Sequence, residues 1–374
     1  MTVLLLAIAA AAYQVAALIA AFRHLRRREP AARVLPPVSM LKPVHGLDPR
    51  FYDAIRSHAV QDYPQFEILF GVSDPADPAA AEIRRLMAEF PEVPIRLVVS
   101  SFRAANGKVG VLADLAREAR HPVLVVNDSD IGVPRDYLRR VVAPLEDPGV
   151  GMVTCLYRGE AGSWPGRLEA IGIATDFAPS VLVAPLVGVS EFALGATMVF
   201  RAEDLRRIGG FAAIADYLAD DYQLSRRIRE LGLRVVISKV VVETNLPDVS
   251  WREAWLHQLR WARTIRVSRG GGYLGMPLTA ATLWALLLAL GGLWWPATAL
   301  MALRLAAGLL VSARVLRAHS SLASALLMPL RDLWGLAVWA GGLCGTSVVW
   351  RDQRLRLTRD GRIAPSGSAP ATGA

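Results

Sequence analysis

Hydrophobic residues are distributed unevenly along the chain, and their spacing divides it into three parts. Residues 3–22 form an uncharged apolar run that is followed at once by a cluster of arginines. Residues 34–245 alternate short apolar runs with stretches in which apolar residues recur every three or four positions. This alternation is typical of strands and helices in an α/β sheet. The C-terminal third is apolar again.

The first apolar run is about long enough to cross a bilayer. A cleavable signal peptide would carry its positive charge before the apolar run and small residues after it, and here the order is reversed. We therefore predict an uncleaved transmembrane anchor at residues 1–22, with its basic end in the cytoplasm according to the positive-inside rule.

The middle part predicts a cytoplasmic α/β domain over residues 34–250. The expected strands are residues 38–41, 66–72, 95–99, 123–127, 150–156 and 195–201. The expected helices are residues 50–60, 78–90, 108–120, 134–146, 202–208 and a segment from 218 to about 231.

The C-terminal part, residues 277–349, predicts membrane segments, with candidate spans at 277–295, 297–313 and 333–349. Arg304 interrupts the second one and must face protein or reach an interface if that segment crosses. Three full crossings would put the basic tail, residues 350–374, outside the cytoplasm, against the charge rule applied to the first span. The topology stays open, and the end of the tail, rich in Ser, Pro, Gly and Ala, is expected to be disordered.

The net charge of +9 could suggest a nucleic-acid partner. Much of the charge, however, lies beside the apolar segments, where basic residues attract anionic lipid head groups. No nucleic-acid-binding module is visible, so the membrane surface is the better partner. The two cysteines are too far apart and too few for a disulfide framework or a metal motif.

Two carboxylates, Asp128 and Asp130, follow directly after the apolar run 123–127. Ligands of open α/β sheets gather at the carboxyl ends of strands. Two carboxylates at that edge can hold a divalent cation and leave positions free for substrate phosphates. An ordinary Asp-rich turn is the alternative, since Asp and Ser are common turn formers.

Asp74 and Lys108 are two further candidate site residues, one at the end of a predicted strand and one at the start of a predicted helix. Asp74 stands at the end of the strand 66–72 and is either a ligand of a nucleotide or the N-cap of the next helix. If the two strands that precede Asp74 and Asp128 are neighbours, both carboxylates face one crevice. Lys108 opens a helix and could reach a phosphate there, although solvated lysines are commoner.

Asp220 and Asp221 begin the helix near residue 220. Adjacent acids at a helix start suit the helix dipole. A helix that directs one of its two acidic side chains towards a cleft can also position a general base. The pair alone does not decide between these two interpretations.

Residues 251–272 predict an interfacial basic helix. Four arginines of this segment fall on one arc of roughly 120°, which ordinarily faces a membrane surface. Arginine also binds diphosphates in bidentate fashion, and tryptophan offers a flat wall, so Arg260 and Trp261 are candidates for donor binding.

Taken in order, these motifs resemble an inverting family 2-type glycosyltransferase with the nucleotide-diphospho-sugar (GT-A) fold, and within that group the ceramide glucosyltransferases of family 21. Asp74, Asp128 and Asp221 match the three separated aspartate motifs of that family, and Arg260-Trp261 match the end of its (Gln/Arg)-x-x-Arg-Trp box. The first box position departs from the pattern because it is His257. In this the chain is similar to bacterial hopanoid-biosynthesis glycosyltransferases.

The resemblance implies a GT-A domain with transmembrane helices in the bacterial inner membrane. It implies transfer of a single sugar, glucose or N-acetylglucosamine, from a UDP-sugar to a lipid hydroxyl of hopanoid or ceramide type. Asp128 and Asp130 would hold Mn²⁺ or Mg²⁺, and Asp221 would be the base, with Asp220 in reserve. The expected donor-binding residues are Asp74, Asp128, Lys108, Arg260, Trp261 and His257.

Three other functions are compatible with parts of the pattern. A processive polysaccharide synthase shares the aspartates and the Arg-Trp box, but needs a channel through several more spans. A polyprenyl-phosphate sugar transferase would need no strong base. An inactive membrane scaffold would have no chemical need for the acidic residues. The sequence leaves the sugar and the lipid acceptor open.

Overall fold

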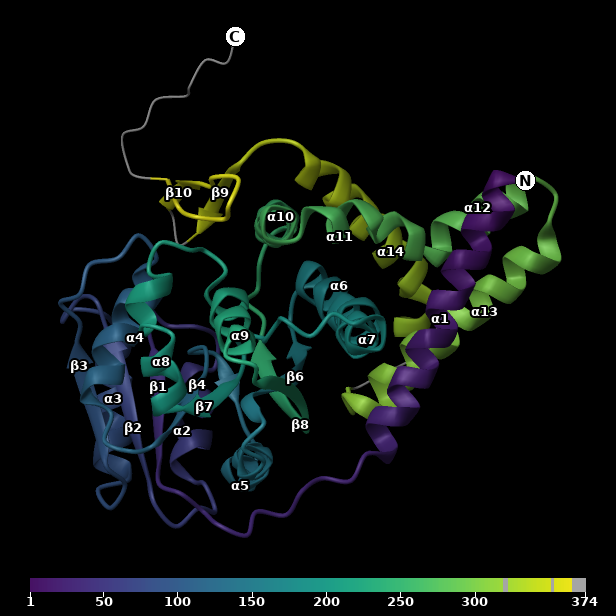
Figure 1. Cartoon of the computed structure of the whole chain (residues 1–374). Coiled ribbons are helices and arrows are strands. Elements are labelled where there is room, and N and C mark those ends of the chain that lie inside the picture. Colours follow the sequence, from purple (N-terminus) through teal and green to yellow (C-terminus); the bar gives the residue numbers. More distant parts are fainter. Residues whose placement is uncertain (319–321, 351–352, 365–374) are drawn as a thin grey trace.

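The computed structural model describes residues 1–318, 322–350 and 353–364, and it places a sheet domain beside a group of long apolar helices (Figure 1). The main sheet has eight strands in the order β3-β2-β1-β4-β7-β6-β8-β5. Its strands are β1 (Val38–Pro43), β2 (Phe66–Val72), β3 (Ile95–Val99), β4 (Val123–Val126), β5 (Ile131–Gly132), β6 (Val150–Glu160), β7 (Met198–Arg201) and β8 (Arg234–Asn245).

The first four strands of the sheet run parallel, so their carboxyl ends meet at one edge. Strand β7 is antiparallel to both β4 and β6, and β6 runs parallel to β8. The short strand β5 follows the Asp128-Asp130 segment and pairs antiparallel with β8. The sheet is therefore mixed, and β5 and β8 extend it beside the acidic segment.

Successive side chains of a strand point to opposite faces of the sheet, and here helices cover both faces, so both sets of side chains are buried. On β1, Met40 packs in one core and Leu41 in the other. One face is covered by α2 (Phe51–Ala59), α3 (Ala79–Glu89) and α5 (Tyr137–Val142). The other is covered by α4 (Gly107–Glu118), α8 (Ala202–Arg207) and α9 (Asp220–Glu230).

Most predicted elements of the middle part are present, with small shifts at their ends. The predicted strands 66–72 and 95–99 have the bounds of β2 and β3, whereas β7 begins three residues later than the predicted strand 195–201. Strand β8 was not predicted. It is long, and its buried residues alternate with half-buried ones.

The apolar helices lie beside the sheet domain (Figure 1). Within the described residues, three of them are long and apolar enough to cross a membrane: Thr2–Arg26, Trp164–Val187 and Trp294–Val315. They comprise α1 (Thr2–Arg26), then α6 (Trp164–Gly172), η2 (Ile173–Phe177), α7 (Ala178–Val183) and η3 (Ala184–Val187), and last α13 (Trp294–Leu310) with η6 (Val311–Val315). The segment Trp164–Val187 lies inside the predicted cytoplasmic domain, where no apolar helix was expected.

The C-terminal region differs from the three predicted spans. Residues 277–290 of the first predicted span belong to a bent pair of helices, with a bend of 45° between Gly270–Thr279 and Ala281–Leu290, whereas its last two residues begin α13. This region contains α11 (Gly270–Gly275), η5 (Met276–Thr279) and α12 (Ala281–Leu290). The third predicted span is divided between α14 (Leu322–Leu343) and the strand β9 (Ser347–Trp350).

The basic tail returns to the sheet domain. Strand β10 (Gln353–Arg356) pairs with β9, and a bridge joins Tyr217 to Arg362. Two hydrogen bonds, from Leu218 N to Gly361 O at 3.4 Å and from Ile363 N to Asp216 O at 2.7 Å, hold the tail against the segment before α9. The segment that was expected to be disordered lies, from residue 365 on, outside the described residues.

A buried ion pair joins the apolar helices. Arg304 on α13 is 4% exposed, and its guanidinium group donates to both carboxylate oxygens of Asp332 on α14, at 2.9 and 2.6 Å. It also donates to the carbonyl of Thr175 at 2.8 Å, and Thr282 on α12 donates to Asp332. Arg304 thus faces protein, as a charged residue in an apolar helix must.

We predict that Arg304→Met lowers the free energy of unfolding of the detergent-solubilised protein by about 3–5 kcal/mol, because it leaves a buried carboxylate without its cation. The double variant Arg304→Met/Asp332→Leu should recover much of this loss. Unfolding midpoints measure both effects. A midpoint of the single variant equal to that of the wild type would contradict the role of the pair.

Candidate active site

The carboxyl edge of the parallel strands carries the acidic segment that follows β4. Asn127 is fully buried, and its amide donates to Ala196 O at 2.8 Å and to Thr197 Oγ1 at 3.1 Å. Lys42, near the end of β1, donates from Nζ to the carbonyl of Asp128 at 3.0 Å. These bonds hold the backbone of the segment from both neighbouring strands.

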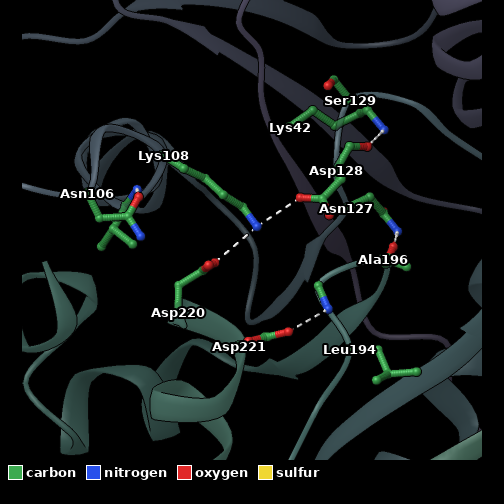
Figure 2. A network of polar contacts seen from close by, with 12 residues as sticks. Lys42, Asn106, Lys108, Asn127, Asp128, Ser129, Leu194, Ala196, Asp220 and Asp221 are labelled. Atoms are coloured by element: carbon green, nitrogen blue, oxygen red, sulfur yellow. Dashed lines mark hydrogen bonds and ion pairs between the residues drawn. The ribbon is translucent and has the colours of Figure 1, made fainter. Parts of the chain in front are cut away.

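Lys108 lies at the centre of the acidic side chains (Figure 2). Its Nζ is 2.8 Å from Asp128 Oδ1 and 3.0 Å from Asp220 Oδ2, and its side chain is only 11% exposed. Burial alone would lower the pKa of Lys108, but the charges of Asp128 and Asp220 outweigh burial and raise it. Lys108 is therefore a charged residue of the site and not a solvated loop lysine.

The first turn of α4 positions Lys108. The side chain of the N-cap residue Asn106 accepts a hydrogen bond from Val109 N, and its amide donates to Tyr217 O at 2.8 Å. The backbone of Asn106 also donates to Ala215 O at 2.9 Å. The start of α4 is thereby attached to the segment that leads into α9.

Asp221 faces the same centre from α9. Its Oδ2 accepts from Gly195 N at 3.2 Å, and its Oδ1 accepts from Tyr222 N at 2.7 Å. Burial and, after it, the charge of Asp220 raise the pKa of Asp221 to about 6. A carboxylate of this kind can accept a proton near neutral pH.

Gly195 leaves room at this centre. A Cβ atom at this position would lie 3.3 Å from Asp128 Oδ2, 3.6 Å from Lys108 Nζ and 3.7 Å from Asp221 Oδ2. The backbone of residue 195 therefore lies among all three charged side chains, and the structure brings Asp128 and Asp221 to one place.

Asp130 turns towards β8, where its carboxylate accepts a hydrogen bond from the hydroxyl of Thr244. Burial, then the charge of Asp128 and also that of Asp48, raise the pKa of Asp130 to about 6. Asp48 itself accepts a hydrogen bond from Ser129. Besides burial, repulsion from the neighbouring carboxylates therefore opposes the ionisation of Asp130.

Repulsion between the carboxylates of Asp128 and Asp130 fits a divalent cation between them. Mg²⁺ and related cations are often bound by one or two carboxylates together with substrate phosphates. A cation beside Asp128 and Asp130 would relieve the repulsion that opposes ionisation of Asp130. In the part of the chain that the structure describes, no group of three or more His, Cys, Asp or Glu side chains forms a metal site by itself.

Asp74 lies at the same edge of the sheet but apart from the centre. Strand β1 separates β2 from β4, so the condition for Asp74 and Asp128 to share one crevice, that their strands are neighbours, is not met. Asp74 is exposed, and its Oδ1 accepts from Ala76 N at 2.8 Å. It is not the N-cap of α3, since that helix begins at Ala79 after Pro78.

The predicted basic helix is α10 (Trp251–Ser268), which begins with a capping box at Ser250. His257 Nδ1 lies 3.2 Å from Glu169 Oε1, and the His257 ring packs against Trp261 with 4.7 Å between ring centroids. Gln258 also donates to Glu169, at 3.2 Å. His257 therefore attaches α10 to α6. Arg260 is half-buried on the same helix.

The basic arc of α10 is partly used inside the protein. Arg263 donates from Nε to Cys344 O at 3.0 Å, and Arg266 donates to the carbonyls of Leu343 and Gly345. These carbonyls lie at the C-terminal end of α14, where cations are favoured. Two of the four arginines that were expected at a membrane surface thus hold the C-terminal segment.

Sequence reasoning missed three residues of this region. Lys42 is fully buried, and burial lowers its pKa to about 7, although nearby carboxylates oppose that shift. A lysine within the apolar strand before the site was the available signal. Glu169 and Gly195 had no recognisable signal in the sequence. Glu169 lies in a helix that was not predicted, and Gly195 was assigned to a strand.

Comparison with known proteins gives a consistent family. The model of glycosyl transferase family 21 matches residues 2–363. Ceramide glucosyltransferase 1 of Caenorhabditis elegans is 27% identical over 207 residues, which is 54% of this chain and 44% of the relative. Ceramide glucosyltransferase 3 of the same organism is 26% identical over 244 residues, or 61% of this chain and 50% of the relative. The chain spans about half the length of these relatives.

Among solved structures, a mannosyltransferase from Pyrobaculum calidifontis, in complex with GDP-Man and Mn²⁺, superimposes with a TM-score of 0.54 and 23% sequence identity. The match covers 91% of this chain and 97% of that one. It confirms the predicted GT-A fold with apolar helices.

We predict that Lys108→Met lowers the free energy of unfolding by about 3–5 kcal/mol, because Asp220 is only 12% exposed and would lose its cation. Adding Asp220→Asn should recover part of the loss. The matched control is Arg226→Met, which breaks an exposed pair with Glu230 and should change stability by less than about 0.5 kcal/mol. Equal unfolding midpoints of the Lys108 and Arg226 variants would contradict the structure of the site.

Proposed function

The chain belongs to glycosyl transferase family 21, and on that premise we propose that it transfers one sugar from a UDP-sugar to the hydroxyl group of a membrane lipid. The observation that carries the proposal is the convergence of Asp128, Lys108, Asp220 and Asp221 around Gly195 at the carboxyl edge of the sheet. Crevices at this edge are where open α/β sheets bind their ligands.

The proposed donor is UDP-glucose or UDP-N-acetylglucosamine, with its diphosphate beside Asp128. Asp128 and Asp130 would hold Mn²⁺ or Mg²⁺, which would neutralise negative charge on the departing diphosphate. Lys108, in the first turn of α4, supplies a second positive charge, and the amide groups of that turn favour an anion as well. We assign Asp74 to the nucleoside end of the donor, and Arg260 and Trp261 to a wall beside the diphosphate.

Asp221 is the proposed general base. Its carboxylate removes the proton of the lipid hydroxyl while the hydroxyl oxygen bonds to the anomeric carbon. The bond from that carbon to the diphosphate breaks in the same step, and UDP leaves with the bonding electrons. Because the hydroxyl attacks from the opposite side, the configuration at the anomeric carbon is inverted. Asp220 is less suited to this role since Lys108 already pairs with it.

For His257, which the sequence suggested as a donor-binding residue, we propose a positioning role instead. Its contact with Glu169 supports a positioning role, in which it holds α10 against α6. Arg260 and Trp261 lie one helical turn further along α10, so this attachment would fix their place at the donor.

The proposed acceptor is a lipid of ceramide or hopanoid type, and the path of the chain supports delivery from a membrane. Leu194 packs in a cluster with Ala17 and Ala20 of α1 and Val181 of α7. The next residue, Gly195, contacts Asp221. The residue that donates to the proposed base is thus next in sequence to one that packs among the apolar helices.

We place the protein in a bacterial inner membrane with the sheet domain on the cytoplasmic side. The cluster of arginines at the end of α1 supports this orientation, because basic residues flank apolar spans on the cytoplasmic side.

We predict that Asp221→Asn lowers the rate of sugar transfer by at least ~10² and leaves UDP binding largely intact, because a general base contributes about 10²–10⁴. The wild-type rate should fall below about pH 6, where the raised pKa of Asp221 leaves the carboxyl protonated. Initial rates of lipid glycosylation from pH 5 to 8, with UDP binding by calorimetry, measure both.

Two controls separate this role from others. Asp216→Asn changes an exposed acid shortly before α9 and should leave the rate unchanged. Asp221→Asn removes a buried charge, so its unfolding midpoint should equal or exceed that of the wild type. Near-normal turnover in the Asp221→Asn variant, with unchanged pH dependence, would exclude Asp221 as the base.

A further inference from the structure

A cavity of about 470 Å³ is lined by the C-terminal end of α1, by residues of η6 after α13, and by the sheet domain at β8. Its wall combines the end of α1, helix α2, strands β6 and β8, and the residues around η6. The size is within the range of small-molecule sites in proteins. Six lysine and arginine side chains line it against three carboxylates: Arg50, Arg140, Arg158, Lys239, Arg314 and Arg317 against Glu29, Asp53 and Glu243.

Each carboxylate already has an arginine partner within the cavity. Arg140 pairs with Glu29 at 2.9 Å, and Arg50 pairs with Asp53 at 3.1 Å. The third pair joins Arg158 to Glu243. The three remaining basic residues of the cavity are Lys239, Arg314 and Arg317. The carboxylates that line the cavity are already paired with the other three.

Of these three, Lys239 is held by backbone. Its Nζ donates to the carbonyls of Leu25 and Arg27 at 2.9 and 3.0 Å, at the end of α1. Arg314 and Arg317 are exposed, and neither has an ion pair or hydrogen-bond partner among residues 1–318, 322–350 and 353–364. Two guanidinium groups at one wall are thus available to a ligand.

Arg317 ends the helical segment η6 in the left-handed conformation in which many helices end. Its φ is 52°, and Ala318 N donates to Ser312 O at 3.0 Å. Among residues with a side chain, asparagine adopts this conformation most readily. Arg317 also lines the cavity.

The cavity lies beside the end of α1, where apolar residues are succeeded by arginines. Ile19 and Phe22 are 49% and 50% exposed on the last apolar turns of α1, and arginines follow from residue 23 on. In a bilayer this transition lies at the lipid head groups. A phosphate in the head-group layer would reach the cavity without leaving the membrane.

The cavity is separate from the acidic centre. Glu243 and Thr244 are consecutive on β8, and successive side chains of a strand point to opposite faces. Thr244 donates to Asp130, whereas Glu243 lines the cavity. The residues assigned to catalysis do not line this wall.

We propose that this cavity binds the phosphate group of an anionic membrane phospholipid, with Arg314 and Arg317 as its ligands. Guanidinium groups match phosphate oxygens in bidentate geometry, and the charge of the phosphate balances cations that the wall leaves unpaired. Binding would join the ends of α1 and α13 to the sheet domain. The proposal goes beyond sugar transfer and does not depend on it.

The test uses the full chain in neutral detergent and measures the unfolding midpoint with added phosphatidylglycerol, phosphatidylcholine or sodium phosphate. Phosphatidylglycerol should raise the midpoint of the wild type by about 3 °C or more, since a ligand that binds only the folded state stabilises it. The variant Arg314→Gln/Arg317→Asn should lose this shift. Asn tolerates the left-handed backbone, so the variant should fold as well as the wild type without lipid.

The matched control is Arg84→Gln/Arg206→Gln, which removes two exposed arginines that do not line the cavity and should keep the full shift. An equal shift in the cavity variant, or no shift in the wild type, would overturn the proposal. A shift with sodium phosphate alone that the cavity variant loses would support a phosphate site but overturn its assignment to a lipid. Equal shifts with phosphatidylcholine and phosphatidylglycerol would overturn the role of charge.

Discussion

The buried ammonium group of Lys108 is the contact on which the arrangement of the site depends. It joins Asp128 at the end of β4 to Asp220 at the start of α9, at 2.8 and 3.0 Å. Without this cation the carboxylates of Asp128, Asp220 and Asp221 would repel one another in a poorly solvated place. The N-cap residue Asn106 fixes the start of α4 against the segment before α9. Three parts of the chain that are far apart in sequence therefore meet at one charge.

The same centre is connected to the apolar helices through the segment that ends in Gly195. Leu194 packs in one hydrophobic cluster with residues of α1, and Gly195 approaches the charged side chains so closely that a side chain there would crowd them. The helices are in turn held together by the pair of Arg304 and Asp332. In the proposed reaction this continuity would let a lipid hydroxyl reach Asp221 while its apolar part stays beside the helices. A donor diphosphate that enters with a divalent cation brings little net charge, so the pairing of Lys108 can persist when it binds.

The parts of the fold that follow from local pattern could be predicted from the sequence. Apolar runs that end in acids predicted β2 and β4, and helical spacing predicted α3 and α4. Strand β8 and the helical segment Trp164–Val187 were missed because their sequence signals are weaker. In β8, buried residues alternate with half-buried ones, and the helical segment contains the π-helical turn Ile173–Phe177. The ion pairs of Lys108 with Asp128 and Asp220 could not be predicted, since they depend on how α4 and α9 pack on one face of the sheet. The contact of His257 with Glu169 depends on the missed helix in the same way.

The most direct measurement is an experimental structure of the full chain with UDP and Mn²⁺. We expect the metal bound by Asp130 or Asp128 together with the diphosphate, with Lys108 close to a phosphate oxygen and Asp221 facing the space beyond it. A nucleotide bound away from Asp128, or a diphosphate and metal that contact none of these carboxylates, would contradict the proposed site.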